Sequence, residues 1–350
     1  MKKQLPFRVL MVIFALATAC AAETVELPPP APVHWQSSAS VAPSPTTPTQ
    51  KERAVADAYT RALASPRLAA LGPLLDEEAV FAFGAQSIRG RERVVKAHEN
   101  MFGAFDGRRF VASRVWLTDS RATLNSQAIE WTMTGAQARE WMKIPPTGKD
   151  VVIKGLSLLW ATDEGVITEI HVYFDDDVVR AQLGSGPPDL AKLPGSPAPD
   201  AQAAETRERS GAPEEASNVA LVRDMLQALE TDKEAAFLSV LADDVDVTSF
   251  DGVDAMRGKA AARAYFRSAR KSIRELDTVV QNLWGVRSFA IAEYALTGLQ
   301  IAPWHRVPVP KDGALHPIHA QFVDVAEISG GKVAHIWRYA DPSAFLSPSP

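Results

Sequence analysis

Two stretches of this chain carry the same short motifs in the same order, and this internal repeat constrains the fold more than any other feature. The matched motifs, first stretch before second, are Ile88-Arg89-Gly90 with Met256-Arg257-Gly258, Glu130-Trp131 with Glu293-Tyr294, and Gly165 to Asp175 with Gly331 to Asp341. At 350 residues the chain also exceeds the length that one hydrophobic core usually organises. The sequence therefore predicts two tandem copies of one small domain.

Two segments of biased composition set the boundaries of these copies. Both are rich in Pro with Ser, Thr or Ala, a composition that favours extended, solvated chain and cannot build a core. The predicted organisation, in chain order, is a signal peptide over 1–19, a Pro/Ser/Thr-rich tether over 20–50, domain 1 over 51–184, a Pro/Ala-rich linker over 185–216 and domain 2 over 217–346.

The N-terminus has the pattern of a secretory leader. Basic residues precede an apolar stretch from Val9 to Ala17, and small residues follow it. This stretch is shorter than the roughly 20 residues that a transmembrane helix needs. A leader predicts export.

The segment LATAC ends at the single cysteine of the chain, Cys20, and resembles the lipobox of bacterial lipoproteins. The resemblance implies lipidation of Cys20 and a lipid-anchored place in the bacterial cell envelope, facing the periplasm or in the outer membrane. Cleavage after Cys20-Ala21-Ala22 is the alternative, and it would release a secreted protein without the cysteine.

Within each copy the spacing of apolar residues changes from helical to extended. Val219, Val222, Leu226 and Leu229 step by three or four residues, as one helix face requires. Long strands are predicted in the first copy at 109–118, 122–134, 150–162 and 166–174. Three helices followed by consecutive strands predict an α+β fold, with the helices packed on one face of a curved antiparallel sheet. Each of the two cone-shaped domains is expected to enclose an apolar cavity.

One further local pattern concerns the second helix of copy two. Thr231-Asp232-Lys233-Glu234 matches a capping box, in which the Thr hydroxyl and the Glu carboxylate satisfy free backbone donors. It predicts that this helix begins after Thr231.

The run from Ile144 to Asp176, IPPTGKDVVIKGLSLLWATDEGVITEIHVYFDD, resembles the C-terminal half of SnoaL-like polyketide or ester cyclases of the nuclear transport factor 2-like superfamily. The IPPTGK loop, the following Gly-x-Ile/Val turn and a strand that ends in aromatic-Asp carry the resemblance. Copy two replaces the loop and is more divergent. The resemblance implies a cone whose open end binds a small apolar molecule, and a carboxylate or His as general acid/base in enzymatic members. A fold does not by itself imply activity.

The last strand of copy one supplies the candidate catalytic residues. Period-two alternation places His171, Tyr173 and Asp175 on one face. A cyclase or isomerase must remove a proton beside a carbonyl, which a histidine held by a carboxylate can do. His171 and Asp175 are therefore predicted as acid/base residues and Glu130 as the orienting carboxylate. The alternative is that this row forms the solvated or interface face of a sheet.

Aromatic and histidine side chains supply the candidate pocket. The residues predicted to line it are Tyr59, His98, Trp131, Tyr173, Trp337 and Tyr339. For His98 and the aromatic residues the alternative is ordinary core packing.

No metal or cofactor is predicted. His316 and His319 are three residues apart, so an extended strand would send their imidazoles to opposite faces. The sequence has neither a phosphate-binding glycine loop nor a dinucleotide fingerprint.

Two functions from different classes remain open. The net charge of -5, without a Lys/Arg cluster, argues against nucleic acid as a partner. The first hypothesis is an exported protein, held at the membrane by its lipid, that binds a small apolar molecule and acts as an ester cyclase or isomerase. The second is a non-enzymatic ligand-binding or protein-interaction module, with its sheets paired as an intrachain pseudo-dimer or in a homodimer. A roomy pocket with titratable groups favours the first, and a filled cone the second.

Overall fold

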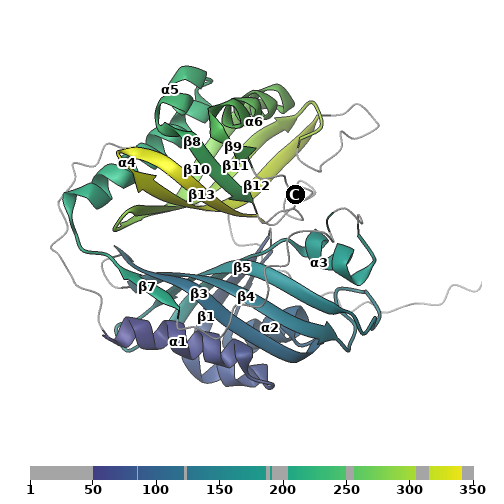
Figure 1. Ribbon diagram of the computed structural model, residues 1–350. Helices are drawn as coiled ribbons and strands as arrows, with labels where there is room; N and C mark the ends of the chain where they lie inside the picture. The colour runs from purple at the N-terminus through teal and green to yellow at the C-terminus, as the bar shows by residue number, and fades with distance from the viewer. Residues whose placement is uncertain are drawn as a thin grey trace, which may run out of the picture.

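The computed structural model describes residues 50–84, 86–121, 124–186, 190, 204–249, 256–304 and 315–340. In these segments two sheets lie face to face and helices cover the outer side of each, which makes four layers (Figure 1). No helix in this part of the chain is long and apolar enough to cross a membrane. The predicted leader, the tether and Cys20 lie outside the described residues.

Domain 1 runs from the first helix to the helix after its last strand. Its elements are α1 (Gln50–Ala64), the 3-10 helix η1 (Leu68–Leu74), β1 (Leu75–Phe83), β2 (Gln86–Arg89), α2 (Arg91–Phe102), β3 (Phe105–Arg121), β4 (Leu124–Gln137), β5 (Asp150–Ala161), β6 (Ile167–Tyr173) and α3 (Asp176–Leu183). The four long strands match the predicted ranges to within a few residues.

Domain 2 repeats this order after a short strand, β7 (Glu205–Glu208). Its elements are α4 (Pro213–Glu230), α5 (Glu234–Ser239), β8 (Leu241–Ser249), β9 (Met256–Arg257), α6 (Gly258–Ser272), β10 (Ile273–Val286), β11 (Phe289–Gln300), β12 (His316–Ser329) and β13 (Lys332–Ala340). The shared strand order is β3-β4-β5-β6-β1-β2 in one sheet and β10-β11-β12-β13-β8-β9 in the other. The predicted duplicated α+β fold is confirmed.

The sheets are mixed. In both domains the first strand pairs with the last in parallel, as β1 with β6 and β8 with β13, while the hairpin-connected strands are antiparallel. The range predicted as linker, 185–216, contains β7, which adds a parallel strand to the β3 edge of domain 1. It also contains the start of α4.

The Arg-Gly motif of the repeat has a backbone reason. Gly90 and Gly258 both adopt positive φ, 104° and 74°, where the chain turns from a short strand into a helix. A side chain is disfavoured in that region because its Cβ approaches backbone oxygen. In α2 the buried face is formed by Val94, His98, Met101 and Phe102, which are three or four residues apart or adjacent, as on one side of a helix.

The predicted capping box is wrong. Thr231 is the C-terminal cap of α4, and its hydroxyl donates to the carbonyl of Gln227 at 2.7 Å. The N-cap of α5 is Lys233, which makes no side-chain capping bond. The hydroxyl is used by the helix that ends there, so it is not available to the helix that follows.

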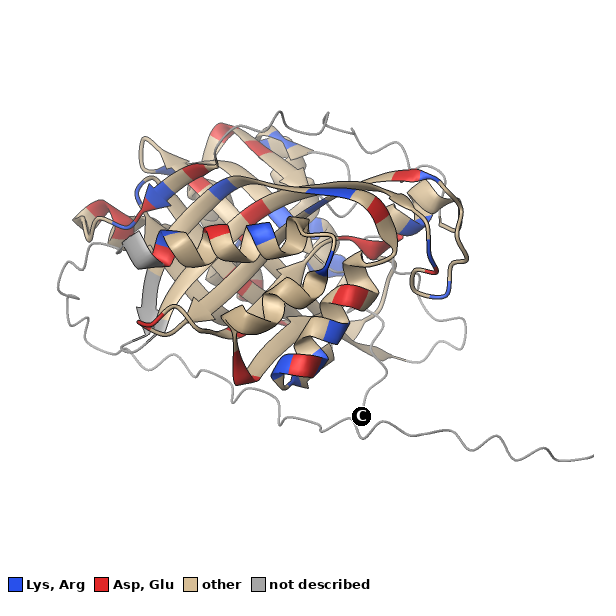
Figure 2. Ribbon diagram, turned by 90° about the horizontal axis from the view of Figure 1, so that it is seen from below, with Lys and Arg blue, Asp and Glu red and all other residues tan. Residues whose placement is uncertain are grey.

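Three apolar clusters stabilise the four layers. Each domain has a core between its helices and its sheet, and a third cluster lies between the two sheets. Its members are Trp116, Ala128, Leu156, Leu158, Trp160 and Tyr173 from domain 1 and Trp284, Val286, Phe289, Ile291, Val323, Val325 and Tyr339 from domain 2. Acidic and basic residues are intermixed along the helices that cover domain 1 (Figure 2).

Candidate ligand-binding site

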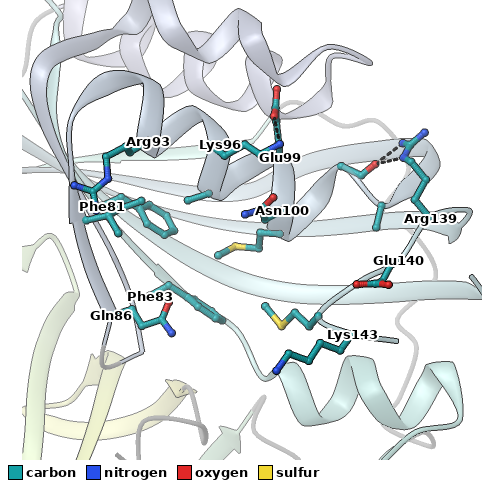
Figure 3. A pocket seen from close by; sticks show the side chains of 16 residues that line it. Phe81, Phe83, Gln86, Arg93, Lys96, Glu99, Asn100, Arg139, Glu140 and Lys143 are labelled. Atoms are coloured by element: carbon teal, nitrogen blue, oxygen red, sulfur yellow. Dashed lines mark hydrogen bonds and ion pairs between the residues drawn. The ribbon is translucent and has the colours of Figure 1, made fainter. Parts of the chain in front are cut away.

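A groove of about 870 Å³ opens on domain 1 between α2, the β1–β2 hairpin and the turn at residues 141–144. Apolar side chains that are buried or half-buried line its inner part: Phe81, Phe83, Ile88, Ala97, Met101, Ala104 and Met142. Most of its polar side chains are exposed at the opening (Figure 3). The groove therefore offers an apolar surface below a charged rim, the usual arrangement of a small-molecule site.

Aromatic rings close the groove toward the interior of the cone. The ring of Phe81 packs on His98 with centroids 4.8 Å apart, and Phe83 stacks on Phe174 at 4.9 Å. Phe174 in turn lies 6.1 Å from Trp131. Among the described residues, side chains thus fill the interior that the sequence predicted as a cavity, and the groove lies at its mouth.

The three predicted pocket residues of domain 1 that meet inside the cone are Tyr59, His98 and Trp131. The Trp131 indole N–H donates to Ser157 at 2.9 Å, and the hydroxyls of Ser157 and Tyr59 are 3.3 Å apart. The Tyr59 hydroxyl lies 3.4 Å from His98 Nε2. The Nδ1–H of His98 must donate to the carbonyl of Val94, 2.9 Å away, so Nε2 is an acceptor. A continuous chain of hydrogen bonds results.

The side chains in this series of hydrogen bonds carry no charge near neutral pH. Burial lowers the pKa of His98 to about 4, and burial also raises the pKa of the Tyr59 hydroxyl. Both side chains are fully buried, at 0% exposure. Since neither is charged near neutral pH nor reaches the groove, the cluster satisfies polar groups inside the core.

The predicted base His171 lies between the two sheets. Its Nδ1 is 2.5 Å from Glu293 of domain 2 and its Nε2 is 2.9 Å from Glu169. The Tyr173 hydroxyl donates to the same Glu293 at 2.6 Å. Burial lowers the pKa of His171, but the two carboxylates outweigh burial and raise it to about 10. With this pKa the imidazole is protonated near neutral pH and forms an ion pair with the two carboxylates.

The orienting carboxylate predicted at Glu130 is placed apart from His171. It accepts from Ser113 at 2.7 Å and from Arg114 Nε at 2.9 Å. The Arg114 guanidinium lies 3.9 Å above the ring of Trp337. Burial, and after it Glu130, raise the pKa of Tyr339. The predicted site residues Glu130, Trp337 and Tyr339 therefore belong to the intersheet layer.

Asp175 lies at the start of α3 and not with His171 or Glu130. Its carboxylate is the N-cap of α3 and accepts from the backbone N–H groups of Asp177 and Val178 at 2.9 and 3.2 Å. Capping satisfies helix donors that would otherwise be unpaired. The structure thus places His171 and Glu130 in the intersheet layer with different partners, and Asp175 at the start of a helix.

The interior of domain 2 holds a buried ion pair that the sequence reasoning missed. Arg338 donates to Asp324 through Nε at 2.8 Å and through Nη2 at 2.7 Å, and Tyr294 donates to the same carboxylate at 3.0 Å. The space beside them is only about 20 Å³, the size of one water molecule. The sequence did carry a signal for this pair, because Asp324 and Arg338 occupy positions on two strands where the alternation predicts an apolar, inward-facing side chain.

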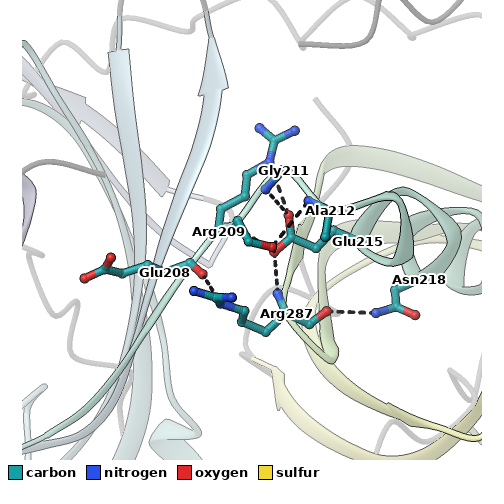
Figure 4. A network of polar contacts seen from close by, with 8 residues as sticks. Glu208, Arg209, Gly211, Ala212, Glu215, Asn218 and Arg287 are labelled. Carbon is teal, nitrogen blue, oxygen red and sulfur yellow. Dashed lines mark hydrogen bonds and ion pairs between the residues drawn. The ribbon is translucent and has the colours of Figure 1, made fainter. Parts of the chain in front are cut away.

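Another polar network joins the linker to domain 2 (Figure 4). The carboxylate of Glu215, 3% exposed, accepts from the backbone N–H groups of Ser210 and Gly211 at 2.8 Å and of Arg287 at 2.7 Å. Asn218 donates to the carbonyl of Arg287 at 2.9 Å. Burial raises the pKa of Glu215, but these backbone donors outweigh it and hold the pKa below its ordinary value.

No three His, Cys, Asp or Glu side chains in the described segments are arranged to hold a metal ion. His316 and His319 both lie on β12, an extended strand.

Comparison with known proteins assigns the family. The SnoaL-like domain family matches residues 56–170 and, a second time, residues 222–336. The chain belongs to this family. Both matches fall inside the predicted domains, and no curated protein matches the sequence.

Solved structures similar to parts of this SnoaL-like protein include a candidate polyketide cyclase from Pseudomonas putida, with 27% identity over 36% of this chain and 92% of that one, at a TM-score of 0.30. A candidate SnoaL-like polyketide cyclase from Jannaschia sp. has 19% identity over 39% and 97%, at 0.34. An LEH-like epoxide hydrolase from M. tuberculosis has 15% identity over 38% and 90%, at 0.31.

We expect His171 to titrate far above the ordinary histidine value of 6.5, at about 10. Replacing Glu293 by Gln should lower this pKa, because Glu293 supplies the largest of the effects that raise it. NMR titration of the imidazole signals measures both. A histidine whose pKa is raised by folding stabilises the folded state fully below pH 6.5, and this contribution is lost as pH rises toward 10. The difference in thermal midpoint between the wild type and Glu293→Gln should therefore decrease over this pH range.

The matched control for this titration is Glu169→Gln, which removes the more exposed of the two carboxylates. It should lower the pKa of His171 less than Glu293→Gln does. A wild-type His171 that titrates near 6.5 would contradict the ion pair.

Replacing Glu215 by Gln should lower the free energy of unfolding by about 1–3 kcal/mol at pH 7, because an amide N–H₂ would face backbone donors. Urea unfolding measures this loss. A carboxylate whose pKa is lowered by folding stabilises the folded state fully above its ordinary pKa of 4.5, and it loses this effect as pH falls through the lowered pKa. The difference in the free energy of unfolding between the wild type and Glu215→Gln should therefore decrease below pH 4.5.

The neighbouring, exposed Glu214 gives the control for this measurement, and Glu214→Gln should leave stability unchanged. Equal urea midpoints for Glu215→Gln and Glu214→Gln would show that the network contributes nothing.

Proposed function

We propose that this protein is a non-catalytic ligand-binding protein of the bacterial cell envelope. In this proposal the groove of domain 1 binds a small, largely apolar molecule, and domain 2 serves as its fixed structural partner. The observation that carries the proposal is the groove itself, about 870 Å³ with an apolar inner surface. A volume of this order accommodates a ligand of drug size.

The positions of the candidate acid/base residues support binding without catalysis. A general base must come within hydrogen-bond distance of the proton that it removes. His171 and Glu130 are held in the intersheet layer, and Asp175 caps a helix. None of them lines the groove. The groove's own titratable residues are mostly exposed surface groups, which are poorly suited to general base chemistry.

The contrast between the two cones supports separate roles for the two domains. The described interior of domain 2 has room for about 20 Å³, and an ion pair occupies the sheet face there. Its sheet covers the sheet of domain 1. Domain 2 is therefore better suited to stabilising domain 1 than to binding a second ligand.

The proposed envelope location rests on the sequence of the leader. Its basic residues, short apolar stretch and Cys20 after small residues are typical of an exported lipoprotein. The Pro-rich tether that follows would hold the domains away from the membrane surface.

Filling the groove should abolish ligand binding. Ala97 lies on the groove wall in α2, and a Trp there would occupy the apolar space. We expect Ala97→Trp to reduce the binding of a neutral apolar fluorophore, the methyl ester of 11-(dansylamino)undecanoic acid, by at least about tenfold, measured by fluorescence titration.

The control for groove filling is Ala220→Trp, the same substitution on the exposed face of α4 in domain 2. It should bind the ester as the wild type does. Unchanged binding by Ala97→Trp, with its circular dichroism intact, would refute the groove as the site.

Lipidation predicts that cells fed an alkyne-labelled fatty acid incorporate the label into the wild-type protein and lose it in Cys20→Ala. The variant should also shift from the membrane fraction to the soluble fraction. An unlabelled wild-type protein whose mature N-terminus lies beyond Cys20 would show that the secreted form is the correct one.

A further inference from the structure

We infer that the ligand of the domain 1 groove is an anionic amphiphile, a molecule with one oxyanion head group on an apolar body. This inference rests on the proposed binding function and names the chemical class of the ligand. Two independent features of the groove carry it, namely its charge and the backbone of one of its walls.

The groove is locally basic on an acidic protein. Its lining includes four cationic side chains, those of Arg93, Lys96, Arg139 and Lys143, and two carboxylates, those of Glu99 and Glu140. The whole chain has a net charge of -5. A concave apolar surface with positive charge at its rim attracts negatively charged molecules, because low-dielectric walls concentrate the field.

Two of these cations are available to a ligand. Lys96 pairs with Glu99 at 3.2 Å, and Arg139 pairs with Asp106 at 3.0 Å. Within the described segments, Arg93 and Lys143 have no carboxylate at ion-pair distance. They flank the opening from α2 on one side and from the turn on the other (Figure 3).

The turn that presents Lys143 has an unfavourable backbone. Trp141 and Ile144 exchange two backbone hydrogen bonds, at 2.9 and 2.8 Å, around a two-residue turn. Both central residues have positive φ, 45° at Met142 and 69° at Lys143. Such turns favour Asn-Gly, because a side chain in this region crowds the backbone. Met and Lys are therefore present at a cost in stability.

That cost has an explanation if both side chains contact a ligand. Backbone strain that persists in a folded protein is often found at binding sites. Met142 lines the apolar part of the groove and Lys143 its rim. The turn is held in place by Trp141, whose indole N–H donates to the carbonyl of Met101 at 2.8 Å. An apolar body would lie against Met142 and Phe83, with the oxyanion at the cationic opening.

The test compares two probes of the same shape, 11-(dansylamino)undecanoic acid and its methyl ester, by fluorescence titration with the full-length protein. We expect the acid to bind about tenfold more tightly than the ester at low salt, from two exposed charge pairs of about threefold each. The preference should decrease as salt screens the charges.

Replacing Lys143 by Gly separates binding from stability. We expect Lys143→Gly to weaken binding of the acid about threefold and to leave the ester unchanged. The same substitution relieves the strain at positive φ and should raise the thermal midpoint by about 2 °C. Weaker binding by a more stable protein cannot be ascribed to unfolding.

The matched control is Glu275→Gly, at an exposed residue of β10 in domain 2 with φ of 55°. It should raise the thermal midpoint and leave the binding of both probes unchanged. In the same titrations Arg93→Ala should weaken binding of the acid alone.

The outcomes separate this inference from the proposed function. Equal affinities for acid and ester would overturn the anionic ligand and leave the groove as a binding site for neutral molecules. Failure of both probes to bind would overturn the proposed function together with the inference. Unchanged acid binding by Lys143→Gly and Arg93→Ala would also overturn the inference.

Discussion

The structure depends on the burial of two sheet faces against each other. Fully burying one large apolar side chain contributes about 1.5–3 kcal/mol, and the intersheet layer contains many, among them Trp116, Trp160 and Phe289. The buried ion pair of His171 and Glu293 in the same layer roughly offsets its own desolvation. Apolar burial therefore provides the stability, and the ion pair favours one relative placement of the two sheets.

This arrangement accounts for the polar row on the last strand of domain 1. His171 and Tyr173 both reach Glu293 across the interface, so the chemistry that suggested a catalytic pair serves the contact between domains. The same burial makes each domain the cover of the other. Neither sheet could be exposed without placing tryptophan side chains in water. At the edge of the layer, the Arg287 guanidinium donates to the carbonyl of Glu208 in β7 at 2.8 Å and adds a second contact between the domains.

The two copies differ inside their cones. At one position of the paired strands Trp131 lies opposite Gly155, where an added Cβ would be 2.3 Å from the indole ring, while in domain 2 Tyr294 lies opposite Phe322. Two residues further along the same strand and on the same face, Ser157 of domain 1 corresponds to Asp324 of domain 2. Copy one thus has a neutral hydrogen-bond chain and a groove at its mouth. In copy two the described interior has a charged pair with room for about 20 Å³ beside it, so one fold encloses two different interiors.

The sequence alone determined the duplication, the element order and the family, because motif spacing and apolar periodicity are local properties. It also showed that His171 and Tyr173 share a face. It did not show what covers that face, since Glu293 lies 122 residues away from His171 along the chain. The filled cone, the positive φ of Met142 and Lys143 and the use of the Thr231 hydroxyl likewise depend on neighbours brought together by folding. A period of two identifies the residues on one side of a strand, and only tertiary packing decides whether that side meets solvent, a ligand or another sheet.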